Sequence, residues 1–124
     1  MKKNHVLVIY GGQEEAEISK VSSKYLISTL NSLKEKNSNL NPVVTQLNTY
    51  KDSEQLLEFI KEFSKDGEVL IIPCIHGAPG ENGEIQKHFE KHNFRYLGSP
   101  PEASWKCYNK VETKIIASSL GIPV

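Results

Sequence analysis

The chain has 124 residues, which is the size of one domain. It is 38% hydrophobic and 24% charged, and its 15 lysines and arginines balance its 15 aspartates and glutamates. This composition is typical of a globular domain, and the neutral balance gives no sign of nucleic acid or an anionic membrane as a partner. The longest apolar runs fall far short of the roughly 20 residues needed to span a bilayer.

The N-terminus has a basic start and a short apolar patch, His5–Tyr10. The patch is too short for a signal peptide and runs into Gly11 and Gly12, so we interpret it as a buried first strand. The two cysteines, Cys74 and Cys107, form no CxxC pattern and no Cys/His cluster. Two free thiols fit a reducing compartment, so we expect a cytoplasmic protein in which Cys74 is a small core residue.

Strand-like and helix-like patterns alternate along the chain. The strand patterns, rich in β-branched and aromatic residues, are His5–Tyr10, Pro42–Leu47, Val69–Cys74 and Phe94–Leu97. A first, amphipathic helix is predicted from apolar and small residues at three- and four-residue steps, namely Ile18, Val21, Tyr25, Leu26, Thr29, Leu30 and Leu33. Further helices are predicted over Leu56–Phe63, Ile85–Phe89, Ala103–Tyr108 and Lys110–Leu120.

Local signals mark the ends of these helices. The polar stretch Lys34–Asn39 predicts a loop after the first helix. Asp52 or Ser53 is a plausible N-terminal cap for the second helix, and Asp66–Gly67 predicts its end. Gly121 predicts the C-terminal stop of the last helix.

This order of elements predicts an α/β fold, a Rossmann-like parallel sheet with right-handed crossovers and helices on both faces. The sequence shows no internal repeat, no low-complexity tract and no inner domain boundary. We therefore expect residues 1–124 to form a single domain. The final segment, Gly121–Val124, is more typical of the start of a linker or strand than of a domain end.

The segment after the third predicted strand is the main candidate site. Val69–Ile72 is apolar on both faces, as in a central parallel strand, and leads to His76 and a loop with Gly77, Gly80 and Gly83. Open parallel sheets bind ligands beyond the carboxyl ends of their strands. A single His at a strand end is often structural, but in this position it can also donate to an oxyanion or a phosphate oxygen near neutral pH.

A second glycine-containing loop, Gly11-Gly12, follows the first strand. It lacks the GxGxxG dinucleotide fingerprint, although a helix start after glycines can attract an anion. Glu14, Glu15 and Glu17 come next, and they either complement the helix dipole or hold a substrate ammonium through Glu15 or Glu17. Because these carboxylates would repel a phosphate, an ammonium fits the charges better than a nucleotide.

Other polar residues are open to two interpretations. Glu81 is either a solvated loop residue or part of the site, and Gln86 is either a residue of a helix start or a partner of Glu81. Lys110 belongs either to a solvated cationic face or to a phosphate-binding site. His88 and His92 share an i,i+4 spacing, but no third ligand is evident, so no metal site is expected.

Four segments carry a resemblance to a known family. They are Tyr10–Gly12 with Glu15–Ser19, the run HGAPGENGEIQ at His76–Gln86, Tyr96–Ser99 with Asn109, Lys110 and Lys114, and the final GIPV at Gly121–Val124. Together they resemble the N-terminal domain of D-alanine–D-alanine ligase, of the ATP-grasp superfamily. The His-Gly run is the most specific of the four, and the resemblance covers essentially the whole chain.

The resemblance implies a domain of an enzyme that makes the D-alanyl-D-alanine dipeptide of peptidoglycan through an acyl phosphate, with ATP and Mg²⁺ or Mn²⁺. It implies that Glu15 binds the ammonium of the first D-alanine, that His76 lies by its carboxylate, and that Lys110 reaches toward ATP. Further substrate-binding positions that it implies are Gly11, Gly12, Ser19 and Gly77. It also implies a homodimer of the full-length enzyme.

The sequence departs from the family's pattern at three places. The Gly-Gly loop is one residue shorter, with Gln13-Glu14 in place of its serine, and Asn82 and Asn109 replace aspartates. The family also has central and C-terminal domains that clamp ATP and bind magnesium, and this sequence contains neither. We therefore expect an excised domain that has no ligase activity alone and binds neither cofactor tightly.

Three alternatives remain at this stage. The chain could come from a divergent ATP-grasp ligase with another substrate, act as a free-standing flavodoxin-like or receiver-like binding module, or serve as an interaction domain. A receiver should carry paired acidic residues after its first strand, and a flavodoxin a phosphate loop rich in Ser and Thr. Gly11 and Gly12 stand at that position instead.

Overall fold

Parallel strands form the centre of the structure, a computed structural model that describes residues 2–124. The strands are β1 (Lys3–Tyr10), β2 (Leu40–Gln46), β3 (Gly67–Pro73) and β4 (Arg95–Tyr96). The helices are α1 (Ala16–Lys36), α2 (Ser53–Phe63), α3 (Glu84–Lys91), α4 (Pro101–Tyr108) and α5 (Lys110–Ser119), with a 3₁₀ turn η1 (Leu47–Thr49).

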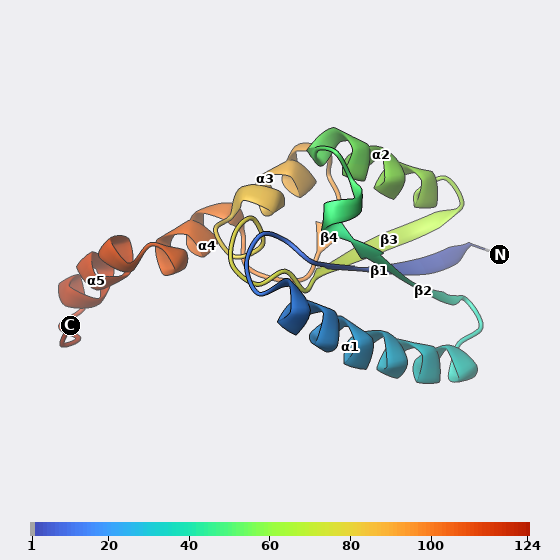
Figure 1. Ribbon diagram of the computed structural model, residues 1–124, viewed down its shortest axis with the longest axis horizontal. Coiled ribbons are helices and arrows are strands. Elements are labelled where there is room, and N and C mark those ends of the chain that lie inside the picture. The colour runs from blue at the N-terminus through green and yellow to red at the C-terminus, as the bar shows by residue number, and fades with distance from the viewer. Residues whose placement is uncertain (1) are drawn as a thin grey trace.

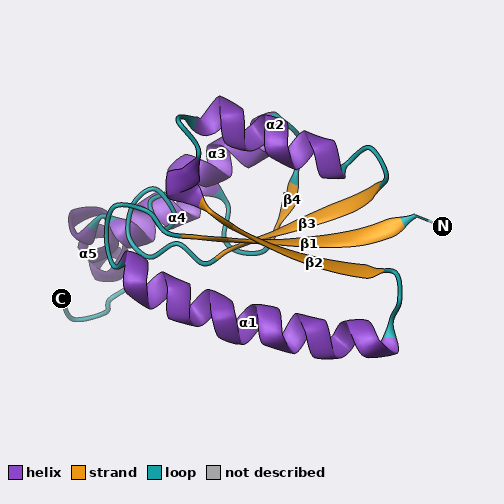
Figure 2. Ribbon diagram, turned by 45° about the vertical axis from the view of Figure 1, so that its right-hand side comes forward, coloured by secondary structure: helices purple, strands orange, loops and turns teal. Residues whose placement is uncertain are grey.

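The four-stranded sheet has the order β2-β1-β3-β4, and all neighbouring strands run parallel. Helix α1 lies on one face of the sheet, and α2 and α3 lie on the other (Figure 1, Figure 2). The predicted α/β fold, a parallel sheet with helices on both faces, is therefore confirmed. Because the strands are parallel, all of their carboxyl ends meet at one edge of the molecule.

Strand β1 has neighbours on both sides, and its side chains alternate between two cores. Leu7 and Ile9 belong to the larger core, which is closed by α2 and α3. Val6 and Val8 belong to the smaller core, which they share with Leu30 of α1. Burying one such side chain stabilises the fold by roughly 1.5–3 kcal/mol, so the strand that leads to the first glycine loop is firmly held.

Helix α1 is confirmed, but most of its apolar stripe does not face the sheet. Its buried residues are Ser19, Ser23 and Leu30. The exposed members of the stripe are Ile18 at 54%, Val21 at 53%, Tyr25 at 75% and Leu33 at 49%. Small hydroxyl side chains thus occupy part of the inward face, and a row of apolar side chains lies on the outer surface.

Strands β1, β2 and β3 each begin two residues earlier than predicted. The early start of β2 places Pro42 inside a strand, which is tolerated because β2 is an edge strand and can lack one N–H donor. The predicted loop at Lys34–Asn39 is wrong at its start, since α1 continues to Lys36. Basic residues at that end of the helix suit its dipole.

The boundaries of α2 are confirmed at the start and corrected at the end. Asp52 accepts a hydrogen bond from the backbone N–H of Gln55 at 2.9 Å, so it is the N-terminal cap. Helix α2 ends at Phe63, and Gly67 begins β3 instead of ending the helix. A Cβ atom at Gly67 would lie 2.0 Å from the carbonyl oxygen of Lys3, so the close approach of β1 requires glycine here.

Helices α4 and α5 project away from the sheet (Figure 1). Gly121 has a φ of +74° and follows the last turn of α5, so the predicted C-terminal stop is confirmed. Among residues 2–124, no helix combines the length and the apolar character needed to cross a membrane.

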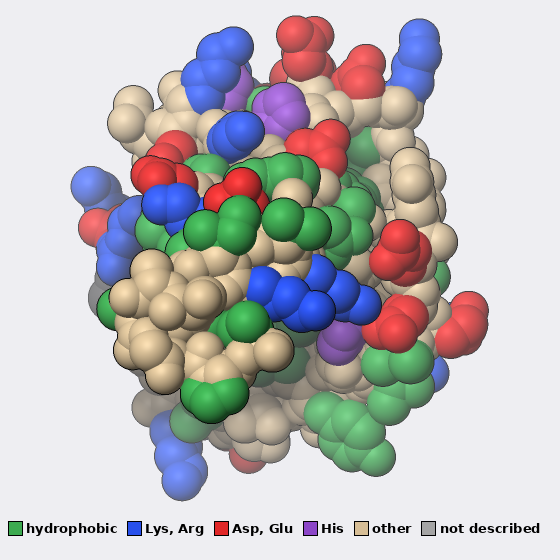
Figure 3. All heavy atoms as spheres, turned by 90° about the vertical axis from the view of Figure 1, so that its left-hand side faces the viewer, with side chains coloured by type: hydrophobic (Ala, Val, Ile, Leu, Met, Phe, Trp, Pro, Cys, Tyr) green, Lys and Arg blue, Asp and Glu red, His purple; other side chains and the backbone are tan. Residues whose placement is uncertain are grey.

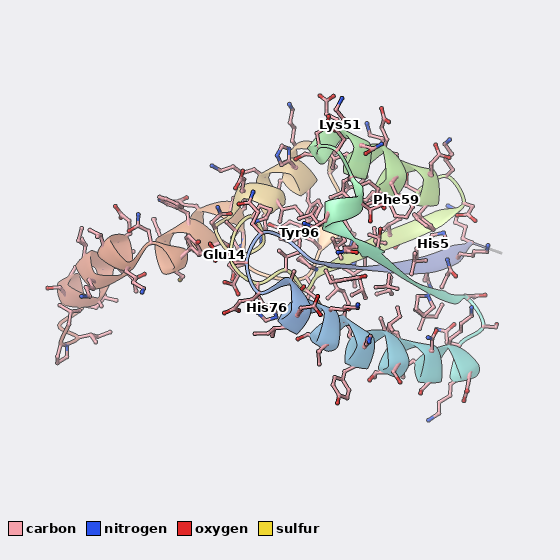
Figure 4. All side chains as sticks on the ribbon, in the orientation of Figure 1. His5, Glu14, Lys51, Phe59, His76 and Tyr96 are labelled. Atoms are coloured by element: carbon pink, nitrogen blue, oxygen red, sulfur yellow. The ribbon has the colours of Figure 1, made fainter. Side chains whose placement is uncertain are left out.

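The buried side chain of His5 connects neighbouring segments at the edge of the sheet opposite the carboxyl ends of the strands (Figure 4). His5 is 3% exposed, its Nε2 lies 2.6 Å from Oδ1 of Asp66, and its Nδ1 lies 2.8 Å from the amide nitrogen of Asn41. Since the amide NH₂ of Asn41 donates, Nδ1 accepts and the proton of the neutral ring is on Nε2, facing Asp66. The ring therefore joins β1 to β2 and to the turn before β3.

This contact predicts a pH-dependent stability. The hydrogen bond from His5 holds the pKa of Asp66 below its ordinary value. A carboxyl with a lowered folded-state pKa stabilises the fold above its unfolded pKa, near 4, and loses that effect as the pH falls through the folded value. We expect Asp66→Asn to lower the urea midpoint at pH 7, and the difference from the wild type to shrink as the pH falls below about 4. The matched control is Glu62→Gln, because Glu62 forms an exposed ion pair with Lys65. An equal loss in the control would contradict the role of Asp66.

Candidate active site

Segments that follow two of the strands, β3 and β4, line an open cleft of about 820 Å³ at the carboxyl edge of the sheet. The β3–α3 loop contributes His76, Gly80 and Glu81, and the segment after β4 contributes Leu97 to Ser99. Helix α4 and the first residue of α5, Lys110, form the opposite wall. In the space-filling view of this end of the molecule, a histidine lies between a basic and an acidic patch (Figure 3).

His76 lies between two carboxylates at this cleft. Its Nδ1 is 4.0 Å from Oε2 of Glu15 and also 4.0 Å from Oε1 of Glu81. The side chain of His76 is 34% exposed, and those of Glu15 and Glu81 are 60% and 54% exposed. All three groups can therefore reach a ligand, and the structure brings together two residues that the sequence predicts as catalytic, Glu15 and His76.

The His76 loop is held by hydrogen bonds within itself. The backbone N–H of Gly77 donates to Oε2 of Glu81 at 2.9 Å, and the N–H groups of Gly80 and Glu81 both donate to the carbonyl of Gly77 at 2.9 Å. One oxygen of Glu81 thus fixes the loop while the other faces His76. Of the two interpretations of Glu81, the structure supports membership of the site.

Gly77 and Glu14 join the two glycine loops. Gly77 has a φ of +70°, and a Cβ atom there would lie 2.4 Å from Oε2 of Glu14. Glu14 therefore packs over Gly77, and Figure 4 shows Glu14 and His76 at the same end of the molecule. Gly77 makes room for the β1–α1 loop, and direct contact of Gly77 with a substrate stays a prediction.

The Gly11-Gly12 loop is tied down from two other elements. The N–H of Gly11 donates to Oγ of Ser19 at 2.7 Å, and the N–H of Gly12 donates to Oδ1 of Asn48 at 2.9 Å. The amide nitrogen of Asn48 returns a hydrogen bond to the carbonyl of Gly12 at 3.2 Å. Both N–H groups are therefore used inside the protein. Ser19 is 0% exposed, so it holds the loop from inside the protein. Contact of Ser19 with a substrate stays a prediction.

Glu15 stands directly before α1 in a left-handed conformation, with φ 49° and ψ 33°. Its side chain caps no N–H group of the helix, so capping does not account for it. Of the acidic residues expected in the first turn, only Glu17 lies within α1. Left-handed backbone is uncommon at a residue other than glycine, and here it accompanies a carboxylate that faces His76.

The two Asp-to-Asn departures preserve a structural role. Oδ1 of Asn109 accepts hydrogen bonds from the N–H groups of Val111 at 3.0 Å and Glu112 at 3.2 Å, which caps α5 beside Lys110. Oδ1 of Asn82 accepts from the N–H of Glu84 at 3.1 Å at the start of α3. Asparagine caps helices about as well as aspartate, so both helix starts remain intact.

Sequence reasoning missed Asn48 and left Gln86 open. Asn48 lies in η1, far along the chain from Gly12. The only signal for Asn48 in the sequence is its position in a polar loop after a predicted strand. Gln86 is 4% exposed, and its Nε2 donates to the carbonyl of Gly80 at 2.6 Å. Its Oε1 is the one buried side-chain oxygen or nitrogen without a partner among the described residues, and Gln86 lines the cleft. Gln86 therefore supports the loop that carries His76.

The described residues hold no group of three or more His, Cys, Asp and Glu side chains that could bind a metal ion. Lys110 is the lysine at the cleft wall that could meet a phosphate, and it takes part in none of the ion pairs among the described residues. The arrangement suits a small zwitterion, with carboxylates for an ammonium and His76 and Lys110 for anionic oxygens.

A strand-end cleft on an open parallel sheet, lined by His, Glu and Lys, defines the class as an α/β ligand-binding domain of the kind found in enzymes. Comparison with known proteins is more specific. The chain is 36% identical over 133 residues to the D-alanine–D-alanine ligase of Vibrio vulnificus strain YJ016, covering 99% of this chain and 40% of that protein. It is 39% identical over 129 residues to that of Tolumonas auensis, covering 99% of this chain and 39% of that protein. No family model matches the chain.

Solved structures agree with these relatives. D-alanyl-alanine synthetase A from Vibrio cholerae superposes with a TM-score of 0.75 at 29% identity, covering 99% of this chain and 39% of that one. The D-alanine–D-alanine ligase from Aeromonas hydrophila superposes with a TM-score of 0.76 at 29% identity, covering 98% of this chain and 48% of that one. The chain is thus homologous over nearly its whole length to the N-terminal part of D-alanine–D-alanine ligases, and spans about 40% of the length of these relatives.

The hydrogen bond of Gln86 predicts a loss of stability on substitution. Gln86→Met leaves the carbonyl of Gly80 without its donor, and an unsatisfied buried acceptor costs about 1–3 kcal/mol. We expect the free energy of unfolding in urea to fall by that amount. Lys87→Met, at an exposed position of the same helix, is the control and should change stability by less than about 0.5 kcal/mol. Equal effects of the two variants would contradict the role of Gln86.

The two cysteines predict different rates of thiol labelling. Burial raises the pKa of the Cys74 thiol, whereas Cys107 is exposed at the cleft. Because the thiolate is the reactive form, we expect Cys107 to react with a disulfide reagent at pH 8 at least about tenfold faster than Cys74. Cys107→Ser should remove the fast phase of the reaction. A fast phase that survives this substitution would show that Cys74 is more accessible than its half-buried position indicates.

Proposed function

We propose that this chain is the substrate-binding N-terminal part of an ATP-dependent D-alanine–D-alanine ligase of peptidoglycan synthesis. The observation that carries the proposal is the placement of His76 at 4.0 Å from both Glu15 and Glu81, in one cleft with Lys110. Homology to the N-terminal 40% of such ligases supports the choice of substrate. In this reaction the carboxylate of one D-alanine is activated as an acyl phosphate, and the amine of a second D-alanine attacks it.

Glu15 and His76 bind the two ends of the first D-alanine in this proposal. The exposed carboxylate of Glu15 receives the ammonium group, because a charge-assisted hydrogen bond is stronger than a neutral one. His76 donates to a carboxylate oxygen, and it stabilises the negative charge that grows there in the transition state. Glu81 orients His76, since its other oxygen is fixed by the N–H of Gly77.

Lys110 fits a phosphate group, because its ammonium stands at the cleft wall at the start of a helix. ATP supplies the phosphoryl group that activates the carboxylate, and Mg²⁺ or Mn²⁺ neutralises its charge. The described residues offer no cluster for that metal. In this proposal the metal ligands and most ATP contacts belong to the central and C-terminal domains of such ligases. We therefore expect this chain by itself to bind neither cofactor tightly and to be inactive as a ligase.

The proposal predicts two results with purified protein. The 124-residue chain alone is expected to release no phosphate from ATP when D-alanine and magnesium are present. The chain extended by the central and C-terminal parts of a related ligase is expected to form the dipeptide.

Substitutions in that extended protein test the two site residues. Glu15→Gln should lower kcat/KM for D-alanine by about 10- to 150-fold, because it removes one hydrogen bond to a charged group. His76→Ala should lower kcat by about 10²–10³-fold, as for the loss of an oxyanion donor.

Glu17→Gln is the matched control, because Glu17 is exposed in the first turn of α1 and forms no ion pair with His76 among the described residues. It should keep kcat/KM within about twofold. Full activity of both the Glu15 and His76 variants would overturn the site. Phosphate release that requires another amino acid in place of D-alanine would favour a divergent ligase of the same superfamily.

A further inference from the structure

A second cavity lies between the start of α2 and helix α3. Its volume is about 290 Å³, and no described residue lines both this cavity and the cleft. We name it the α2–α3 pocket, and its walls include Asn48, Lys51, Ser53, Leu57, Glu84 and His88. Figure 4 shows Lys51 beside α2 and His76 beside the start of α1, far apart in the view. The volume is close to the lower end of the range for small-molecule sites, about 300–1,000 Å³.

The floor of the α2–α3 pocket belongs to the larger core. It is formed by Leu56 and Leu57 of α2 and by Ile85 and Phe89 of α3. All four are between 0% and 4% exposed, so their positions are fixed by packing before any ligand enters. Such a floor favours a ligand with an apolar body, because the ligand replaces water over apolar side chains.

The rim of the pocket carries two acidic and two basic side chains. Asp52 is bound as the N-terminal cap of α2, and Oε2 of Glu84 accepts a hydrogen bond from the amide of Asn82 at 3.1 Å. Lys51 and His88 take part in none of the ion pairs among the described residues. The rim is neutral in sum, but its donors are the side chains without a charged partner. They therefore favour an anionic group on the ligand.

The pocket also borders both loops of the candidate active site. Gly12 and Gln13 line it from the β1–α1 loop, and Pro79 lines it from the His76 loop. Asn48, in the pocket wall, exchanges two hydrogen bonds with the backbone of Gly12, at 2.9 and 3.2 Å. Gly12 stands three residues before Glu15, so a ligand against Asn48 is one contact away from the loop that carries Glu15.

We propose that the α2–α3 pocket binds a small organic anion with an apolar body, an aromatic or branched aliphatic carboxylate. The apolar body rests on the core floor, and the carboxylate accepts hydrogen bonds from Lys51 and His88. The bound ligand also holds the Gly11-Gly12 loop. Opening of the contact between Gly12 and Asn48 removes one wall of the pocket, so a ligand that needs the wall opposes the opening. Binding is independent of the proposed ligase function, and only its effect on catalysis rests on that function.

A titration of the 124-residue chain, followed by the NMR signals of its backbone N–H groups, tests the binding. The probe is 3-phenylpropanoate, and the matched control is 3-phenylpropanamide, which has the same shape and no charge. We expect the carboxylate to bind with a Kd of about 1 mM and the amide at least about fivefold more weakly. The signals of Asn48, Ser53 and His88 should shift, whereas those of Gly98 and Ser99 at the cleft should not.

Substitutions at the rim test the position of the carboxylate. Lys51→Met and His88→Leu should each weaken binding of 3-phenylpropanoate at least about fivefold, because each removes a donor. Glu84→Gln should strengthen it about twofold or more, since it removes a like charge, and a damaged fold would not produce this gain. Lys87→Met is the matched control, because Lys87 is exposed on α3 and does not line the pocket. It should change the Kd by less than about twofold, and circular dichroism checks that each variant is folded.

Hydrogen exchange tests the effect on the loop. The N–H of Gly12 donates to Asn48, and its exchange reports the opening of that contact. With the probe at about ten times its Kd, exchange of Gly12 should slow at least about threefold relative to that of Leu97, whose N–H donates to Ile71. An unchanged ratio overturns the effect on the loop.

Three results overturn the binding site itself. They are no binding of 3-phenylpropanoate at 10 mM, equal losses in Lys51→Met and Lys87→Met, and binding that Lys110→Met abolishes while Lys51→Met does not. The last result assigns the probe to the cleft. None of these assays contains ATP or D-alanine, so their failure is distinguishable from failure of the proposed ligase function.

Discussion

Hydrogen bonds from side chains to loop backbone hold the candidate site together. Ser19 and Asn48 bind the Gly11-Gly12 loop, and Glu81 and Gln86 bind the His76 loop. Loops at a strand end lack the backbone partners of a sheet, and their buried polar groups must be satisfied by side chains. Ser19, Asn48 and Gln86 belong to α1, η1 and α3, and Glu81 to the His76 loop itself, so the relative position of the two loops depends on the packing of the whole domain.

This dependence explains why the site is built on a parallel sheet. The carboxyl ends of β1 and β3 are neighbours, because β1 pairs with β3 in register from Lys3 to Ile9. Loops that leave adjacent strands start close together, so Glu15 and His76 can face each other although 60 residues separate them along the chain. A substrate smaller than either loop can then contact both.

The sequence predicted the fold better than the contacts of the site. Strand positions followed from apolar runs such as Val69–Ile72, because an unbroken apolar run between polar segments is typical of a strand in a parallel sheet. The orientation of α1 was not predictable in this way, since the buried face includes Ser19 and Ser23 while an equally regular apolar stripe faces outward. Periodicity identifies a helix, but it does not say which of two faces meets the sheet. Asn48 was missed because its role depends on a contact with Gly12 that is 36 residues distant.

Pro42 within the edge strand β2 has a consequence for self-association. Exposed strand edges are templates for fibril growth, since their free N–H and C=O groups can pair with another chain. Proline removes one donor from β2, and the opposite edge, β4, has only two residues. Both borders of the sheet are thus poor templates for amyloid-like addition.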